Sequence, residues 1–282
     1  MPVITVITPV HDGGDAYLPE TLESLREQQL PEEWRLQWVV QEDGEEGRAL
    51  ARHHELLTAY PWISTGYGRA GGAARARTLG LLRAKGEVIR TVDADDLLPD
   101  SEVLARDIRV LTENPEIGWV TAPCLDLMPD GTLLPGPSDP APGPLPHRLL
   151  LDGAIADALP VMGTTSTIRT EIVQALGGWP ALPGYEDAAL LLAAEAVADG
   201  WMQEKPGELY RKHEAQSTKA AGHLDLSERS ARIQAAINRA EALWRTGWRW
   251  SPKNAVPAQP RSATLDSADT CLDSIERHGA RR

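Results

Sequence analysis

The sequence has 282 residues, of which 42% are hydrophobic and 24% are charged, and its formal net charge at pH 7 is −13. This length is enough for one large domain with a buried core, and the composition is that of an ordinary globular protein. The negative charge argues against nucleic acid and against an anionic membrane surface as partners, because both bind cationic residues. A phosphorylated substrate stays open, because a bound cation can reverse the local charge.

The chain shows no signal for membrane insertion or secretion. No apolar run approaches the ~20 residues that span a bilayer, and no basic segment precedes the apolar start. Cys124 and Cys271 are far apart in the sequence, which favours free thiols in a reducing compartment. We therefore expect a cytoplasmic protein without an integral membrane segment.

Strands and helices alternate through the first hundred residues. β-Branched and apolar runs that end in turn signals predict strands at residues 3–8, 36–41, 63–66 and 87–92. Helical spacing of apolar residues predicts helices at 17–29, 47–60 and 73–84. This alternation predicts an α/β fold with a mostly parallel sheet, which binds ligands at the carboxyl ends of its strands.

The second part of the chain is less regular. Helices are predicted at residues 102–113, 149–159, 170–176, 186–198 and 226–244, and strands at 118–125 and 164–169. The stretch 129–146 is rich in Pro and Gly and is predicted to be a surface loop. His53 and His54 have no Cys or carboxylate at metal-ligand spacing, so we interpret them as surface residues of a helix.

Polar clusters follow three of the predicted strands: the loop after Thr8, the turn at Asp43, and the turn with Asp93 and Asp95. These clusters should meet at one edge of a parallel sheet. Alternating carboxylates at a strand end point to the same side, and Mg²⁺ typically binds one or two carboxylates together with substrate phosphates. The alternative is a solvated turn in which one acid caps the next helix.

Six short motifs occur in an order that resembles family 2 of the glycosyltransferases, which have the GT-A fold. They are TPVHD at 8–12, VVQEDG at 39–44, GAARARTLG at 72–80, AKGEVI at 84–89, GGW at 177–179 with GYED at 184–187, and YRKH at 210–213. The resemblance implies a Rossmann-like GT-A domain over 1–222, with a nucleotide-binding half at 1–100 and an acceptor half at 101–222. We expect a helical extension at 223–250 and a polar tail at 251–282.

The resemblance also implies roles on the donor side. Arg77 would lie near the donor phosphates, and Asp93 would face the ribose. Asp95 would hold a divalent metal, Mn²⁺ or Mg²⁺, with Asp93 and His213 as further ligands. Taken alone, a histidine on a polar stretch such as His213 is more often a surface residue than a ligand. The base pocket would be lined by Pro9, Asp12 and Asp43, although His11, Asp12 and Thr78 depart from the family pattern.

The same resemblance places a catalytic base at Asp187, with Glu186 beside it. A carboxylate can take the proton of an acceptor hydroxyl, and attack opposite the departing diphosphate inverts the anomeric carbon. The predicted helix start at these residues should lower a carboxylate pKa. The alternative for this pair is simply an acidic helix start.

The implied reaction is an inverting, metal-dependent transfer from a nucleotide-diphosphate sugar, with UDP expected, to a hydroxyl or amine of a small metabolite or a glycan. A nucleotidyltransferase is the second hypothesis, but it would usually carry a basic Gly-rich loop after the first strand, where this chain has the acidic HDGGD at 11–15. A non-catalytic nucleotide-sugar-binding protein is the third, against which the presence of Asp93, Asp95 and Asp187 argues. The sugar, the acceptor and the oligomeric state, a homo-oligomer included, stay open.

Overall fold

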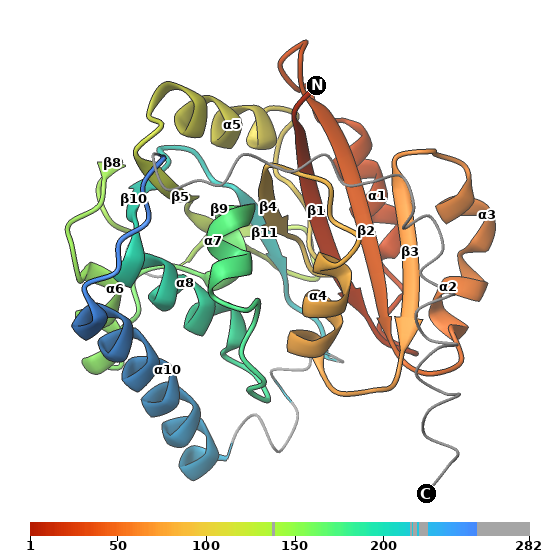
Figure 1. Ribbon diagram of the computed structural model, residues 1–282. Coiled ribbons are helices and arrows are strands. Elements are labelled where there is room, and N and C mark those ends of the chain that lie inside the picture. The colour runs from red at the N-terminus through yellow and green to blue at the C-terminus, as the bar shows by residue number, and fades with distance from the viewer. Residues whose placement is uncertain (137–138, 215, 217–218, 220–224, 253–282) are drawn as a thin grey trace, which may run out of the picture. The chain divides into compact units, whose positions relative to one another are not determined.

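The computed structural model describes residues 1–136, 139–214, 216, 219 and 225–252. Residues Met1–Pro252 form one compact unit (Figure 1). The predicted polar tail lies outside the described residues from 253 onward, and so does Cys271. Cys124 is buried and free, and no helix of the described part is long and apolar enough to cross a membrane.

The alternating strands and helices of the first hundred residues are confirmed. The strands are β1 (Val3–Val10), β2 (Arg35–Asp43), β3 (Ile63–Gly68) and β4 (Val88–Thr91). The helices are α1 (Leu18–Arg26), α2 (Arg48–Arg52), α3 (His54–Thr58) and α4 (Ala73–Leu81). The single helix predicted at 47–60 is wrong in one respect, because the backbone leaves the helical region at His53, where φ is −106° and ψ is 18°.

The second half contains more strands than the sequence indicates. Its helices are α5 (Val103–Glu113), α6 (Leu149–Ile155), the 3₁₀ turn η1 (Gly163–Thr165), α7 (Thr170–Ala175), α8 (Glu186–Val197) and α10 (Leu226–Thr246). Its strands are β5 (Ile117–Thr121), β6 (Cys124–Leu127), β7 (Leu133–Pro135), β8 (Gly143–Pro144), β9 (Thr167–Arg169), β10 (Asp199–Met202) and β11 (Glu208–Arg211).

Three sequence predictions need correction here. The strand predicted at 118–125 is two strands, because Pro123 cannot donate a backbone hydrogen bond and interrupts the ladder between β5 and β6. The predicted loop at 129–146 contains the short strands β7 and β8. The four-residue strands β10 and β11 were not predicted, because neither carries a run of β-branched residues.

The main sheet has eight strands in the order β3-β2-β1-β4-β9-β5-β10-β8. β1 pairs in parallel with β2 and β4, β2 with β3, and β5 with β10, whereas β9 runs antiparallel to both β4 and β5. A second sheet has the order β11-β6-β7. The mostly parallel sheet flanked by helices that the sequence predicts is therefore confirmed.

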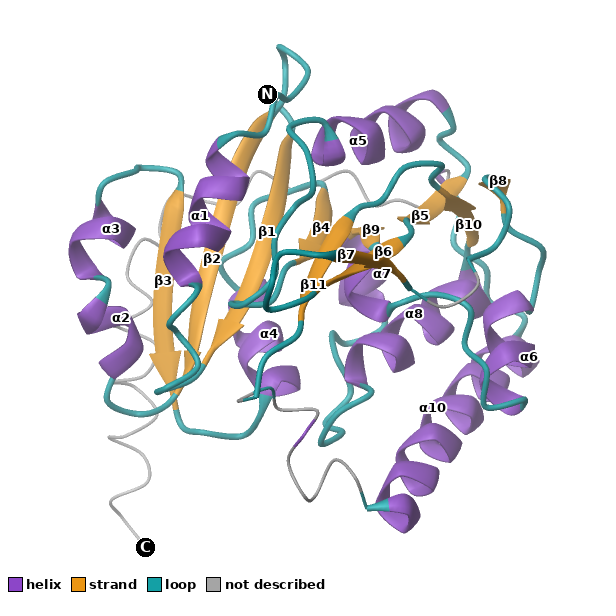
Figure 2. Ribbon diagram, turned by 180° about the vertical axis from the view of Figure 1, so that it is seen from behind, coloured by secondary structure: helices purple, strands orange, loops and turns teal. Residues whose placement is uncertain are grey.

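Helices cover both faces of the main sheet. α4 lies on one face and α1 on the other (Figures 1 and 2). Side chains alternate along β1, so Ile4 and Val6 join one hydrophobic cluster with α1, and Ile7 joins the other with α4 and α8. Leucines at helical spacing pack onto the sheet. On α1 these are the buried residues Leu18, Leu22 and Leu25.

α8 is the central helix of the second half. Eleven of its residues are buried, and α10 packs against it through side chains that include Ala236 and Ala240. α10 begins at an ordinary cap, where the Asp225 carboxylate accepts hydrogen bonds from the Ser227 and Glu228 N–H groups, and it ends at Gly247, with φ of 68°. This packing fixes the start of α8, which carries Glu186 and Asp187.

Candidate active site

The polar clusters predicted at the strand ends do meet at one edge of the sheet. β1, β2 and β4 are parallel neighbours, so the loop after β1, Asp43 at the end of β2 and the turn after β4 share this edge (Figure 1). The turn after β4 is attached to β1, because the Thr8 hydroxyl donates to the Val92 carbonyl at 2.7 Å. Trp38 Nε1 donates in turn to the Thr8 hydroxyl at 2.8 Å.

Arg77 joins the turn after β4 to the start of α8. Its Nη2 contacts Asp93 Oδ1 at 2.6 Å, and its Nη1 contacts Glu186 Oε1 at 2.5 Å. The Arg77 side chain is only 3% exposed, so its permanent charge requires these two carboxylate partners. Its buried Nε has no hydrogen-bond partner among the described residues. The structure thus brings together three residues that the sequence singled out from distant segments.

Asp95 and His213 form a second pair at the same edge. Asp95 Oδ2 lies 2.7 Å from His213 Nε2, and the two side chains are 28% and 20% exposed. His213 follows β11, whose last residue, Arg211, donates from its backbone N–H to Asp96 Oδ1 and from Nε to the Asp95 carbonyl, both at 2.8 Å. These bonds hold the end of β11 against the turn after β4.

Arg211 and Tyr17 are residues of this site that the sequence reasoning missed. The Arg211 guanidinium lies 4.2 Å from the centre of the Tyr17 ring, and that ring lies 5.3 Å from the imidazole of His213. Tyr17 therefore packs between the two side chains that approach Asp95. The YRKH motif contains Arg211 and could have indicated it, whereas Tyr17 precedes a helix and carries no local signal.

Asp95 and His213 contact each other at hydrogen-bonding distance, and a carboxylate and an imidazole are both side-chain types that bind divalent metals. Within the described ranges, however, no three His, Cys, Asp or Glu side chains form a group that could hold a metal, and Asp93 is paired with Arg77 instead. Further ligands would have to be water or phosphate oxygens, as is usual for Mg²⁺.

Asp187 lies in the first turn of α8 and is partly exposed. Its Oδ1 accepts a hydrogen bond from the Ala188 N–H at 2.7 Å. Burial raises the pKa of Asp187 to about 6, and the adjacent Glu186 charge adds to this effect, whereas Arg77 and the Ala188 N–H oppose it. The expectation that the helix start would lower this pKa is wrong, because desolvation and a neighbouring carboxylate outweigh the helix dipole.

Asp43 binds the backbone of the loop that precedes α4. Its two carboxylate oxygens accept hydrogen bonds from the Gly71 and Gly72 N–H groups at 2.7 and 2.9 Å. Its neighbour Glu42 is buried and accepts from the Leu50 N–H at the start of α2. Pro9, near the end of β1, is partly exposed at the same edge. Asp43 thus ties the end of β2 to the loop before α4.

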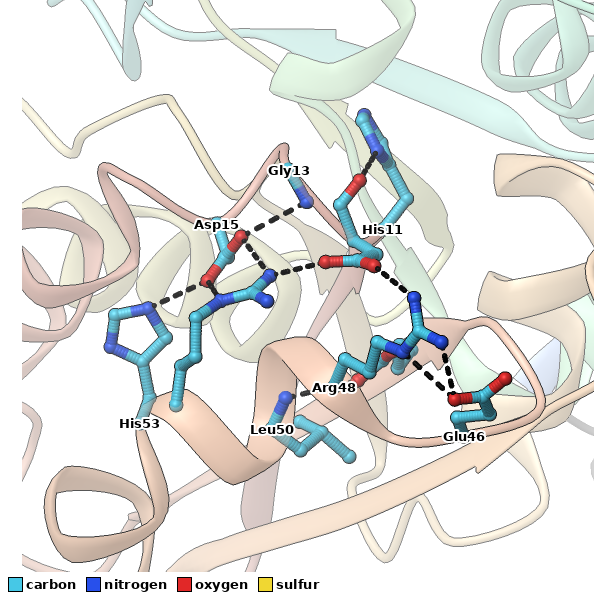
Figure 3. A network of polar contacts seen from close by, with 10 residues as sticks. His11, Gly13, Asp15, Glu46, Arg48, Leu50 and His53 are labelled. Atoms are coloured by element: carbon cyan, nitrogen blue, oxygen red, sulfur yellow. Dashed lines mark hydrogen bonds and ion pairs between the residues drawn. The ribbon is translucent and has the colours of Figure 1, made fainter.

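Asp12 belongs to an ionic network between the loop after β1 and α2. Figure 3 shows this network, with Asp15, Arg48 and His53 labelled. Its carboxylate pairs with Arg52 at 2.6 Å and with Arg48 at 3.4 Å. Arg52 also pairs with Asp15 at 2.8 Å, and this interaction lowers the pKa of Asp15 to about 2. His53 Nε2 lies 3.0 Å from Asp15 Oδ2 and is mostly buried, so its interpretation as a surface histidine is wrong.

A mostly parallel sheet with an acidic turn after its fourth strand, and with carboxylates at the start of a neighbouring helix, has the architecture of the GT-A fold. Residues 5–123 match the model of glycosyl transferase family 2. The match covers less than half of the chain and indicates a glycosyltransferase. No curated protein sequence matches the chain.

Solved structures of TarS from S. aureus share the fold. TarS 1–349 in complex with UDP-GlcNAc has a TM-score of 0.63 at 18% identity, covering 87% of this chain and 74% of that one. The complex of TarS 1–349 with UDP has a TM-score of 0.57 at 18% identity, covering 87% and 73%. The longer TarS structure gives 0.56 at 18% identity, covering 88% of this chain and 45% of TarS.

Proposed function

We propose that this protein transfers a sugar from a UDP-sugar to a hydroxyl or amine acceptor, with inversion at the anomeric carbon and with Mn²⁺ or Mg²⁺ bound. The observation that carries the proposal is the Arg77 bridge, which holds Asp93 of the acidic turn and Glu186 of α8 in one charge network. TarS, which shares the fold, has been solved with UDP-GlcNAc and with UDP, and this supports a uridine nucleotide as donor.

The donor would lie along the carboxyl edge of β1, β2 and β4. Pro9, Asp12 and Asp43 would surround the base, and Asp93 would face the ribose. The loop that Asp43 holds through the Gly71 and Gly72 N–H groups leads directly into α4, which carries Arg77. Binding of the base would thereby be coupled to the position of the Arg77 guanidinium.

Asp95 and His213 would hold the metal, with Asp93 beside them. When bound, a divalent ion neutralises the negative charge that develops on the departing diphosphate. Arg77 would add positive charge at the same end of the donor, and its buried Nε is free to donate a further hydrogen bond. The Tyr17 and Arg211 side chains would keep His213 next to Asp95.

Asp187 would act as the general base. It would accept the proton of the acceptor hydroxyl or amine while the acceptor atom bonds to the anomeric carbon and the bond to the diphosphate breaks on the opposite face. A base works best with a pKa near the operating pH, and the pKa of Asp187, about 6, leaves it mostly ionised at neutral pH. The acceptor would be a small metabolite or a glycan.

The test is product release from a panel of donors. Wild-type protein would be incubated with UDP-GlcNAc, UDP-glucose, UDP-galactose and a GDP-sugar, with Mn²⁺ or with EDTA, and the released nucleotide would be quantified. We expect UDP release that requires the metal. Release of pyrophosphate would favour a nucleotidyltransferase, and tight UDP-sugar binding without any product would favour a non-catalytic binding protein.

A further inference from the structure

The orientation of the Asp187 carboxylate is not set by a side-chain partner. Among the described residues, its one hydrogen bond comes from the adjacent Ala188 N–H. Glu186, by contrast, is held by Arg77. A catalytic base must be kept within a fraction of an ångström of its productive position, so something other than hydrogen bonding must restrict this side chain.

The backbone of Gly163 in η1 lies close to Asp187 and Ala188. A Cβ atom built on Gly163 would lie 2.5 Å from the Ala188 nitrogen and 2.8 Å from Asp187 Cγ, closer than such atoms come in real proteins. The φ of Gly163 is not in the left-handed region, so its backbone conformation does not require glycine. The lack of a side chain is therefore required by the space next to Asp187.

Hydrogen bonds to β4 and β11, the strands next to the acidic turn, hold η1 in place. Thr164 Oγ1 donates to Glu208 Oε1 of β11 at 2.5 Å, and the Thr165 carbonyl accepts from buried Arg90 of β4 at 3.0 Å. The Ser166 hydroxyl donates back to the Gly163 carbonyl at 2.8 Å. Hydrogen bonds of the η1 turn thus hold Gly163 in place relative to β4 and β11, the two strands that lead to Asp95 and His213.

The backbone is also restrained directly before α8, on the N-terminal side of Asp187. Tyr185, directly before the helix, has φ of 68°, a conformation that costs a non-glycine residue about 1 kcal/mol or more. Asp187, Gly163, Ser166 and Thr91 are among the residues that line a cavity of about 10 Å³, which has room for about one water molecule. The carboxyl group therefore lies in a narrow space bounded by Gly163.

We propose that Gly163 is a positioning residue for the reaction: its bare backbone leaves the space in which the Asp187 carboxylate is held, and η1 transmits the position of β4 and β11 to the base. This inference rests on the proposed role of Asp187 as base. It adds that the geometry of the base is set by steric contact with a glycine of a separate element.

The test is Gly163→Ala, with Gly153→Ala as the matched control. A Cβ atom on Gly153 would also be crowded, at 2.8 Å from Pro160 Cδ and 2.9 Å from the Ala158 carbonyl oxygen, but it lies in α6, away from Asp187. The assay is UDP release from a UDP-sugar with water as acceptor. We expect kcat of Gly163→Ala to fall about 10- to 100-fold, since displacement by an ångström can have that effect, with KM for the donor within twofold. A kcat of Gly163→Ala within twofold of the control would overturn the proposal.

Ser166→Ala serves where Gly163→Ala proves too unstable to assay. It removes only the hydroxyl that fixes the η1 turn on Gly163, so the fold should persist. We expect a severalfold lower kcat and an unchanged donor KM, and an unchanged kcat would count against the proposal.

A double variant separates this inference from the proposed function. In an Asp187→Asn background, Gly163→Ala should change the residual rate by less than twofold, because the base is already absent. A further tenfold loss would show that Gly163 acts elsewhere. Wild-type turnover by Asp187→Asn alone would instead refute the assignment of the base.

Discussion

At the scale of single residues, the site depends on buried charges that satisfy one another. Arg77 binds two carboxylates, one of them on Glu186, 109 residues further along the chain, and loss of Arg77 would leave buried Glu186 without its ion-pair partner. The sequence predicts that Arg77 lies near the donor phosphates, but its observed contacts are with Asp93 and Glu186. Substitution of Arg77 should therefore first reduce the stability of the fold.

We predict that Arg77→Met lowers the free energy of unfolding by about 3–5 kcal/mol, measured by urea denaturation at pH 7.5. Arg75→Met is the control, because Arg75 lies two residues earlier on the same helix and is exposed. Equal stability of the two variants would show that the Arg77 ion pairs contribute little.

The raised pKa of Asp187 makes a prediction about activity. A general base must be ionised, so kcat/KM should fall as the pH drops below about 6, where this carboxyl of the free protein becomes protonated. The measurement is the pH dependence of kcat/KM for UDP release between pH 4.5 and 8. A kcat/KM that stays level down to about pH 4.5 would mean that a carboxyl with an ordinary pKa, or a different group, takes the proton.

At the scale of elements, α8 makes a contact with another helix of the second half that its sequence does not predict. Glu195 reads as one acid in a run of Ala and Leu, yet it is buried and its two oxygens accept hydrogen bonds from the Leu150 and Leu151 N–H groups at 2.8 and 3.0 Å. It therefore caps α6 from another helix. Periodicity predicts that α8 exists but not which of its side chains reaches a distant helix end.

Glu195 should make stability depend on pH. Burial raises its pKa to about 7, above the ordinary 4.5, so its contribution to stability is present at low pH and is lost as the pH rises through 7. We predict that the stability of wild type relative to Glu195→Gln falls by on the order of 2–3 kcal/mol between pH 4.5 and 8, measured by urea denaturation. A pH-independent difference would contradict the burial of an ionisable group there.

The sequence predicted the elements whose signals are local. β1, β2 and β4 carry β-branched runs and end in acidic turns. The motifs predict Asp95 and His213 as neighbours, which the structure places 2.7 Å apart, but they do not predict the contact of Asp93 and Glu186 through Arg77. β10 and β11 are defined by pairing with β5 and β6, which are distant in sequence, and so leave no local pattern. The pKa of Asp187 and the contact of Gly163 also arise only from tertiary packing.

At the scale of the whole molecule, the site is an assembly of segments from both halves. β1, β2, β4 and α4 form the proposed donor side, while η1, α8 and β11 support Asp187 and His213. Arg77 and Arg211 link these two sets, since each contacts the turn after β4, and Arg90 of β4 links them through the Thr165 carbonyl of η1. A ligand that contacts both sets should stabilise the folded unit as a whole, by about 2.7 kcal/mol at a concentration of one hundred times its Kd.

The proposed function requires that a nucleoside diphosphate binds at the turn after β4 with the help of a metal at Asp95. Isothermal titration of UDP into wild-type protein, Asp95→Ala and the exposed-turn control Asp130→Ala, each with Mn²⁺ and with EDTA, tests it directly. We predict that Mn²⁺ tightens UDP binding at least tenfold in wild type and in Asp130→Ala, and that this gain disappears in Asp95→Ala. The same Mn²⁺-dependent affinity in Asp95→Ala, or no UDP binding by wild type, would contradict the claim.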